Sequence, residues 1–193
     1  MHRRRFLAET SLVGGLALAG CVSRPEGQST TTTRTAPGQH PFQFEASVVA
    51  AEPTVSRPPV IDVAVTNTDD TTHVLATPND DFPFPTPRAS NDGSALVLDS
   101  TSPTRQADDC WRTIPTVLPA IAGHRFEPTE TLSKEYAVLN HDSNTACWPA
   151  ASYEFFQEYA LDPNDETTLD GGTPFTWGFT VVVDNEPSIV VEE

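Results

Sequence analysis

Cys110 and Cys147 are the residues of this sequence best placed for covalent chemistry. Each stands directly before a tryptophan, and a bond between their sulfurs would close a loop of about 38 residues. In an exported domain, two such cysteines most often form a disulfide, worth about 3–4 kcal/mol in the chain-entropy treatment. We therefore predict a disulfide between Cys110 and Cys147.

Metal binding is the alternative chemistry for this pair. A zinc site would have to recruit His124 or His141, but no Cys-x-x-Cys or His-x-x-x-His spacing supports one. A blue-copper site needs cysteine, histidine and methionine on one loop, and Met1 is the only methionine. The disulfide is the stronger interpretation, and we expect no metal and no other cofactor.

The third cysteine, Cys21, closes an N-terminal leader. Arg3 and Arg4 precede Phe6 and Leu7, and an apolar run of small residues then ends in Leu-Ala-Gly-Cys. The first part resembles a twin-arginine export signal and the second resembles a lipobox. This resemblance predicts export, cleavage before Cys21 and a lipid on the new N-terminal residue.

Two other interpretations of the leader are weaker. The apolar run at residues 12–20 is shorter than the roughly 20 residues of a membrane-spanning helix. Ordinary secretory cleavage at Ala17-Leu18-Ala19 would leave Cys21 as an incidental thiol. We favour a diacyl-type anchor, because a single acyl chain holds a protein only marginally. The predicted location is the extracellular face of the cell membrane.

The chain is strongly acidic, with 11 Lys+Arg against 27 Asp+Glu and a formal charge of −16. Lys134 is the only lysine, and the carboxylates are scattered. This composition resembles that of proteins from extreme halophiles. It excludes nucleic acid as a partner, because phosphate binding requires clustered basic residues. A concentrated calcium site is the alternative, but the acidic segment 162–172 lacks the glycine and glutamate positions of a calcium loop, so we predict a solvated turn there.

The chain divides into three parts. Residues 1–20 form the leader, residues 21–41 form a flexible threonine-rich stalk, and residues 42–193 form one domain large enough for a single core. Threonine runs of this kind can carry O-linked sugar or act as plain spacers, and the sequence does not distinguish the two. The stalk would hold the domain away from an anionic membrane that repels it.

The domain has the alternating apolar pattern of β-strands. Expected strands cover residues 42–48, 60–65, 72–76, 95–98, 132–139, 153–159 and 175–183, and we expect residues 72–76 to pair with 60–65 across a turn at 67–70. Prolines interrupt residues 113–122, which we predict to be a loop. The pattern predicts an all-β, antiparallel immunoglobulin-like sandwich of about seven to nine strands.

Three segments carry a family resemblance. Residues 63–70, Val-Ala-Val-Thr-Asn-Thr-Asp-Asp, resemble a strand and turn common in immunoglobulin-like domains of exported prokaryotic proteins. Residues 127–136 resemble an edge strand, and residues 148–155 resemble the entry to a late strand. Their order is similar to that of the intracellular proteinase inhibitor family and its relatives among haloarchaeal lipoproteins. The resemblance implies the sandwich fold and assigns no inhibitory residues.

No catalytic motif accompanies this fold. The sequence lacks Gly-x-Ser-x-Gly, Ser-x-x-Lys and a glycine-rich phosphate loop. We expect its histidines to be exposed, in turns or at strand ends, and its tryptophans to lie in the core or around the disulfide. The sequence therefore predicts a binding or accessory module for an unknown protein or carbohydrate ligand. The alternatives are an unrecognised hydrolase and a protease inhibitor whose loop, residues 79–90, presents Phe82 and Phe84.

Overall fold

The computed structural model describes residues 40–78, 81–84, 88–91, 93–99, 104–107, 110–114 and 120–192. The side chains of residues 88 and 104–107 are not described. The leader residues Arg3, Arg4, Phe6, Leu7 and Cys21 and most of the stalk lie outside these ranges, so their roles stay predictions. In the described part of the chain, no helix is long and apolar enough to cross a membrane.

Twelve β-strands form from these residues. Their bounds are β1 Phe42–Ala50, β2 Val60–Asn67, β3 His73–Pro78, β4 Arg88–Asn91, β5 Ser94–Asp99, β6 Thr104–Ala107, β7 Cys110–Thr113, β8 Ile121–Phe126, β9 Thr131–His141, β10 Ala151–Leu161, β11 Thr173–Val183 and β12 Ile189–Glu192. The described residues contain no helix.

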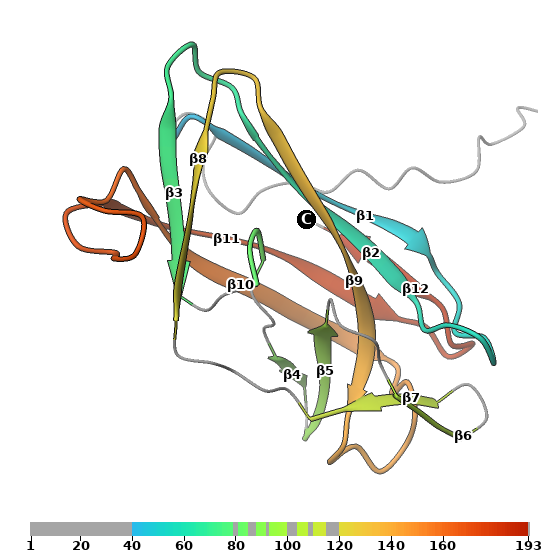
Figure 1. Ribbon diagram of the computed structural model, residues 1–193. Helices are drawn as coiled ribbons and strands as arrows, with labels where there is room; N and C mark the ends of the chain where they lie inside the picture. Colours follow the sequence, from blue (N-terminus) through green and yellow to red (C-terminus); the bar gives the residue numbers. More distant parts are fainter. Residues whose placement is uncertain are drawn as a thin grey trace, which may run out of the picture.

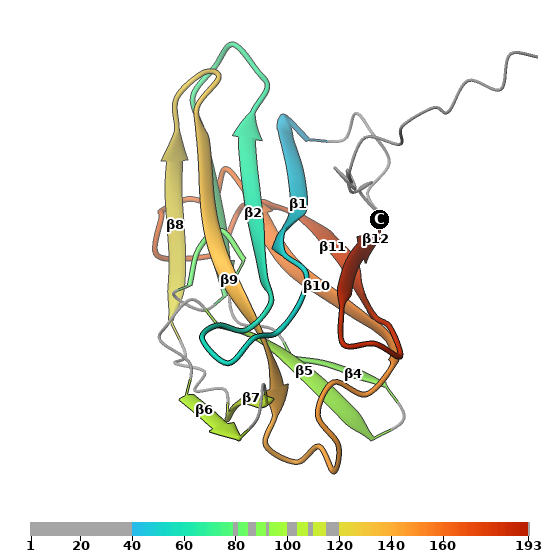
Figure 2. The ribbon, with the colours of Figure 1, turned by 90° about the vertical axis from the view of Figure 1, so that its right-hand side faces the viewer.

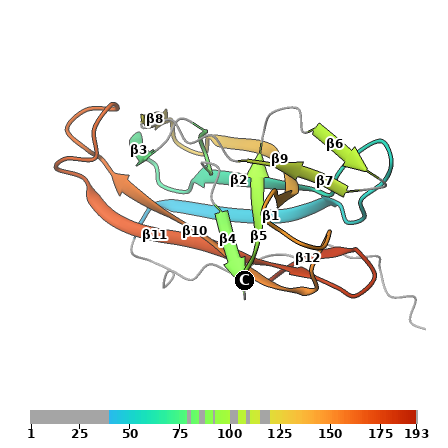
Figure 3. The ribbon, with the colours of Figure 1, turned by 90° about the horizontal axis from the view of Figure 1, so that it is seen from below.

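The strands build two sheets that pack face to face. The first has the order β1-β2-β9-β5-β4, with β7 also paired to β9 and β6 to β7, and the second has the order β12-β11-β10-β3-β8. Every pair is antiparallel except β7 with β9. In Figure 3, β2 and β9 of the first sheet lie over β10 and β11 of the second. The predicted all-β sandwich is confirmed.

Alternating side chains create the core between the sheets. On β2, Ile61, Val63 and Val65 are all fully buried, while their neighbours are partly exposed. On β11, Trp177 is fully buried and its ring stacks on Phe44 of β1 at 4.9 Å between centroids. Trp177 is therefore a core residue, as predicted. Burial of such large rings supplies much of the hydrophobic stabilisation of a sandwich of this size.

The expected pairing of β3 with β2 is wrong. We expected β3 to pair with β2 as a hairpin, but β3 crosses to the second sheet and pairs with β8 and β10. The buried Asn67 supports the crossing: its Nδ2 donates to Thr71 O at 2.8 Å and to Glu127 O at 3.2 Å. These bonds give partners to two backbone carbonyls where the chain leaves the first sheet, so β3 does not have to pair with β2 to satisfy them.

The segment between β3 and β8 accounts for the larger number of strands. β3 and β8 are direct neighbours in the second sheet, and β4 to β7 come from the chain between them. These four short strands gather at one end of the sandwich (Figure 1). β5 then extends the first sheet beyond β9. Of the segment 113–122 that we expected to be a loop, Thr113 ends β7 and residues 121 and 122 begin β8 (Figure 2), while residues 115–119 lie outside the described ranges.

Phe82 and Phe84 do not form the exposed loop that we expected. Phe84 is fully buried, with its ring 5.4 Å from Trp177, and its backbone N–H donates to the Tyr136 hydroxyl at 3.0 Å. Phe82 is partly buried and packs on Phe126. Removal of apolar ring surface from water is favourable. Both rings therefore pack against the core instead of facing solvent. The assignment of a binding loop to these residues is corrected.

Candidate functional site

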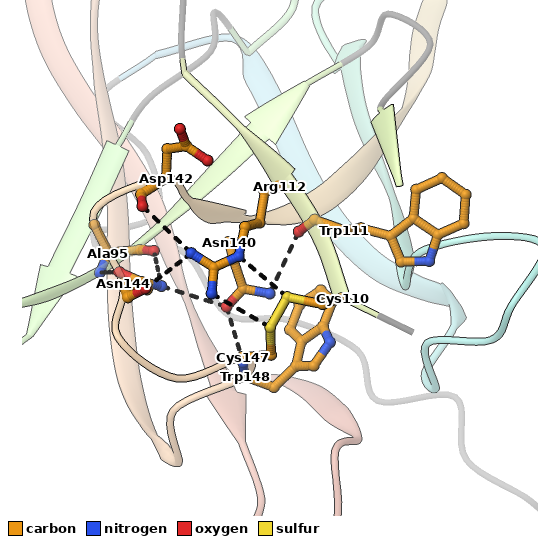
Figure 4. Close-up of a disulfide and its surroundings, with 9 residues drawn as sticks. All are labelled: Ala95, Cys110, Trp111, Arg112, Asn140, Asp142, Asn144, Cys147 and Trp148. Atoms are coloured by element: carbon orange, nitrogen blue, oxygen red, sulfur yellow. Dashed lines mark hydrogen bonds between the residues drawn. A yellow bond between two sulfur atoms is a disulfide. The ribbon is translucent and has the colours of Figure 1, made fainter. Parts of the chain in front are cut away.

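Cys110 and Cys147 form the predicted disulfide (Figure 4), with 5.7 Å between their Cα atoms. Cys110 begins β7, and Cys147 lies in the loop that joins β9 to β10. The bond therefore ties the short strand β7 to the loop that leads into β10. The two sulfur-bearing residues differ in exposure: Cys110 is 6% exposed, whereas Cys147 is an exposed residue.

The guanidinium of Arg112 lies against both sulfurs. Its Nε donates to Cys110 Sγ at 3.2 Å and its Nη2 donates to Cys147 Sγ at 3.5 Å. Residues two apart on a strand share a face, so Cys110 and Arg112 of β7 point to the same side. Nη1 donates to the backbone oxygens of Asn144 at 2.8 Å and Asp142 at 3.3 Å. The permanently charged guanidinium thus contacts both sulfurs and also holds the β9–β10 loop next to the disulfide.

Two buried asparagines hold the same loop from the inside. Asn144 accepts from the backbone N–H of Ala95 at 2.8 Å and donates to its carbonyl at 2.8 Å, so it pairs with β5 as a strand residue would. Asn140 accepts from the backbone N–H of Trp148 at 2.8 Å, and Asn144 donates to Asn140 Oδ1 at 3.3 Å. The sequence offered no signal for this pair, because asparagines near a turn are usually exposed.

The tryptophans beside the cysteines have separate roles. Successive residues of a strand point to opposite faces, so Trp111 turns away from the disulfide and donates its Nε1–H to Thr54 O at 2.9 Å. Trp148 lies beside the sulfurs (Figure 4). We expected both rings to shield the disulfide, and only Trp148 does. With Trp177, all three tryptophans are at least 92% buried and offer no flat plate for stacking on a sugar.

A second candidate site lies on the outer face of β10 and β11. Phe156 of β10 is 61% exposed, which makes it the largest of the exposed apolar side chains in the described ranges. It faces Gly178 of β11, where a Cβ would fall only 2.9 Å from the Phe156 Cβ. Glu154 and Glu158 lie on either side of Phe156 on the same face of β10 and are also exposed.

A pocket of about 260 Å³ opens beside this face. Glu158, Leu169, Pro174 and Thr176 contribute to its wall. Leu169 belongs to the loop between β10 and β11, which therefore forms one side of the pocket. The combination of an exposed ring, two carboxylates and an apolar hollow is suited to a ligand that carries both apolar and cationic groups.

The loop at residues 162–172 exposes Asp162, Asp165 and Asp170 to solvent, as expected of a solvated turn, and it also rests on the second sheet. The carbonyl oxygen of Glu166 occupies the place that a Cβ of Gly123 would fill, so the loop lies directly on β8. Arg125 pairs with Glu166 at 3.0 Å. Asp162 and Val74 exchange two bonds of 2.8 Å, from Asp162 N to Val74 O and from Val74 N to Asp162 Oδ1.

His73 of β3 also fastens this loop. Its Nδ1 lies 2.8 Å from Asp162 Oδ2 and its Nε2 lies 3.1 Å from Asp69 Oδ2. Burial alone would lower the pKa of the imidazole, but the bonds to Asp162 and Asp69 outweigh it and raise the pKa above its ordinary value. His73 begins β3 and so lies at a strand end, as expected, but its side chain is only 16% exposed, which is less than we expected.

His40 and His124 also make specific contacts. The His40 ring stacks on Phe175 at 4.2 Å, and burial lowers its pKa. His124 lies 3.1 Å from Glu130 and stacks on Phe82. Within the described residues, no group of three or more His, Cys, Asp or Glu side chains is arranged to hold a metal ion.

A family model matches the N-terminal part of the chain. Residues 1–78 are similar to a family model described as "Domain of unknown function (DUF8130)". That segment includes the predicted leader and stalk and ends with β3. No curated protein and no solved structure matches the chain.

Proposed function

We propose that this protein is an exported binding domain, attached by a lipid on Cys21 to the extracellular face of the cell membrane. The leader motif and the threonine-rich stalk support the export and the tether. The acidic surface supports a domain that the stalk holds away from an anionic bilayer. The site of ligand binding is the outer face of β10 and β11, with Phe156 at its centre.

The main support for this assignment is the exposed ring of Phe156 beside the pocket. The Phe156 ring is 61% exposed on a central strand, so it is open to a partner, and the pocket lies beside it. Glu154 and Glu158 surround the ring with negative charge. Charge complementarity therefore favours a protein partner that presents an apolar residue next to lysine or arginine.

A carbohydrate ligand and protease inhibition receive less support. Stacking on a sugar uses broad aromatic plates, and all three tryptophans are buried. The inhibitor hypothesis relied on Phe82 and Phe84 in an exposed loop, and Phe84 is fully buried. The protein partner is consequently the ligand class that the surface chemistry supports best.

Peptide binding to the mature chain tests this proposal. The chain carrying Cys21→Ser should bind short peptides that combine lysine or arginine with leucine or phenylalanine, and the amide signals of residues 154–158, 175 and 176 should shift on titration. Phe156→Ser should weaken the binding about tenfold or more, because it removes the central contact. Val55→Ser is the matched control, because Val55 is 63% exposed but lies in the β1–β2 loop.

Two results would contradict the proposal. One is equal binding by the Phe156→Ser and Val55→Ser proteins. The other is binding of soluble oligosaccharides at this face with no response to any of the basic peptides.

A further inference from the structure

The two sulfurs of the disulfide are not equivalent toward a reagent in solution. Cys147 is exposed in the β9–β10 loop, whereas Cys110 is 6% exposed at the start of β7. Trp148 lies beside the bond (Figure 4). Because thiol–disulfide exchange requires direct approach to a sulfur, an external thiolate can attack Cys147 Sγ far more easily than Cys110 Sγ.

The sulfur that would leave is the one closest to a positive charge. Attack at Cys147 expels Cys110 as a thiolate, and Arg112 Nε already donates to Cys110 Sγ at 3.2 Å. A neutral disulfide sulfur is a weak acceptor, so this bond adds little to the oxidised protein. The same bond to a thiolate is charge-assisted and much stronger. Arg112 therefore stabilises the reduced form more than the oxidised form.

The guanidinium is fixed in place before any reaction. Its Nη1 donates to Asn144 O at 2.8 Å and to Asp142 O at 3.3 Å, and these bonds do not involve sulfur. Asn144 is in turn held by Ala95 and Asn140. The donor therefore needs no rearrangement when the negative charge develops on Cys110 Sγ.

We propose that Cys110–Cys147 is a thiol–disulfide exchange site whose co-reactant is an external dithiol. One thiolate of the dithiol attacks Cys147 Sγ, the bond between the two protein sulfurs breaks, and Cys110 leaves as a thiolate paired with Arg112. The second thiolate of the dithiol then attacks the dithiol sulfur bound to Cys147 and releases Cys147 as a thiolate. The dithiol is oxidised to a disulfide, and the protein receives two electrons.

The domain stays folded while its disulfide is reduced and re-formed. Asn140 and Asn144 hold β5 and the β9–β10 loop by bonds that survive reduction. β7 also remains paired with β9 through Arg112 and Thr113. Exchange at this site therefore proceeds in the native protein and does not wait for unfolding.

Reduction kinetics of the full-length chain carrying Cys21→Ser test the proposal. The disulfide should be reduced by dithiothreitol in native buffer while far-UV circular dichroism reports a folded protein. Arg112→Gln, which keeps hydrogen bonding but removes the charge, should slow the reduction about tenfold. It should also shift the equilibrium with a glutathione buffer about tenfold toward the disulfide, which is about 30 mV for a two-electron couple. Arg125→Gln is the matched control, since Arg125 pairs with Glu166 far from the sulfurs.

The direction of the change separates this role from a structural one. If Arg112 only stabilised the loop, Arg112→Gln would loosen the site and reduction would become faster. Faster or unchanged reduction in Arg112→Gln overturns the proposal, and so does reduction of the unsubstituted protein only at its rate of global unfolding.

A second measurement does not depend on the Arg112 variant. Glutathione is added to the native protein, the reaction is stopped by alkylation, and the mixed disulfide is located by peptide mass. The proposal expects glutathione on Cys147 and the alkyl group on Cys110. Glutathione on Cys110, or an equal distribution between the two cysteines, contradicts the order of attack.

Discussion

The loops that enter and leave β10 lie at opposite ends of that strand and are held to the sandwich in different ways. The entering loop carries Cys147 and is fixed by a disulfide and by the buried amides of Asn140 and Asn144. The leaving loop, residues 162–172, has no covalent link and rests on β3 and β8 through backbone bonds and the partly exposed ionic groups of His73 and Arg125.

The two loops are therefore held by interactions that respond differently to salt and pH. Buried amide bonds and a disulfide are insensitive to salt, so the entering loop keeps a geometry that can hold Arg112 against sulfur. Partly exposed ion pairs contribute little individually and respond to pH and ionic strength. The leaving loop borders the pocket beside Phe156, and we expect its looser attachment to let the pocket adjust to a ligand.

Asn144→Ala should produce the largest loss of stability at the entering loop. The substitution leaves the N–H and carbonyl of Ala95 without partners in a buried place, which costs about 2–3 kcal/mol of unfolding free energy. Urea unfolding measures this. Asn91→Ala is the control, because Asn91 makes one exposed bond to Ser152 O, and it should cost less than about 1 kcal/mol. Equal losses in the two variants would show that the buried amide does not fasten this loop.

Gly123→Ala should loosen the leaving loop with a smaller effect on global stability, about 1–2 kcal/mol. The new Cβ would meet the backbone of Glu166, so the loop must move away from β8. Hydrogen exchange should accelerate at residues 162–172 and stay unchanged at residues 142–148. Arg125→Gln is the control and should change exchange less, because it removes only an exposed ion pair. Unchanged exchange at residues 162–172 in Gly123→Ala would contradict the packing described for this loop.

The smallest effect concerns pH. The pKa of His73 is raised in the fold above its ordinary value of 6.5, so the imidazolium contributes stability that is fully present below pH 6.5. That contribution is lost as the pH rises through the raised pKa. A titration of the His73 ring signals by NMR should give a midpoint above 6.5, and exchange at residues 162–172 should increase above that midpoint. His73→Gln should abolish this dependence, and a midpoint below 6.5 would contradict the pairing with Asp69 and Asp162.

The sequence was informative where local pattern decides structure. The alternation of Ile61, Val63 and Val65 predicted a strand with one buried face, and the pair Cys110 and Cys147 predicted a disulfide. Both depend on residue type and spacing alone. The β-sandwich could therefore be predicted without knowledge of the strand order.

Features that depend on tertiary context could not be predicted. β8 was recognised only in the structure, because Gly123, His124 and Arg125 interrupt its apolar pattern and its outer face is covered by a loop far along the chain. Phe84 was expected to be exposed because it lies between prolines, but the space between the sheets accepts its ring. Arg112 reaches the sulfurs only because β7 is a strand, a fact that the four residues of β7 do not reveal by themselves.

Fractionation of cells that produce the protein would show whether Cys21 carries a membrane anchor. We predict that the unsubstituted protein fractionates with membranes as a chain that begins at residue 21 and is heavier than its sequence mass by a lipid. Cys21→Ser should be exported but released from the membrane fraction. Equally firm membrane association of Cys21→Ser, or recovery of the uncleaved chain from the cytoplasm, would contradict the account.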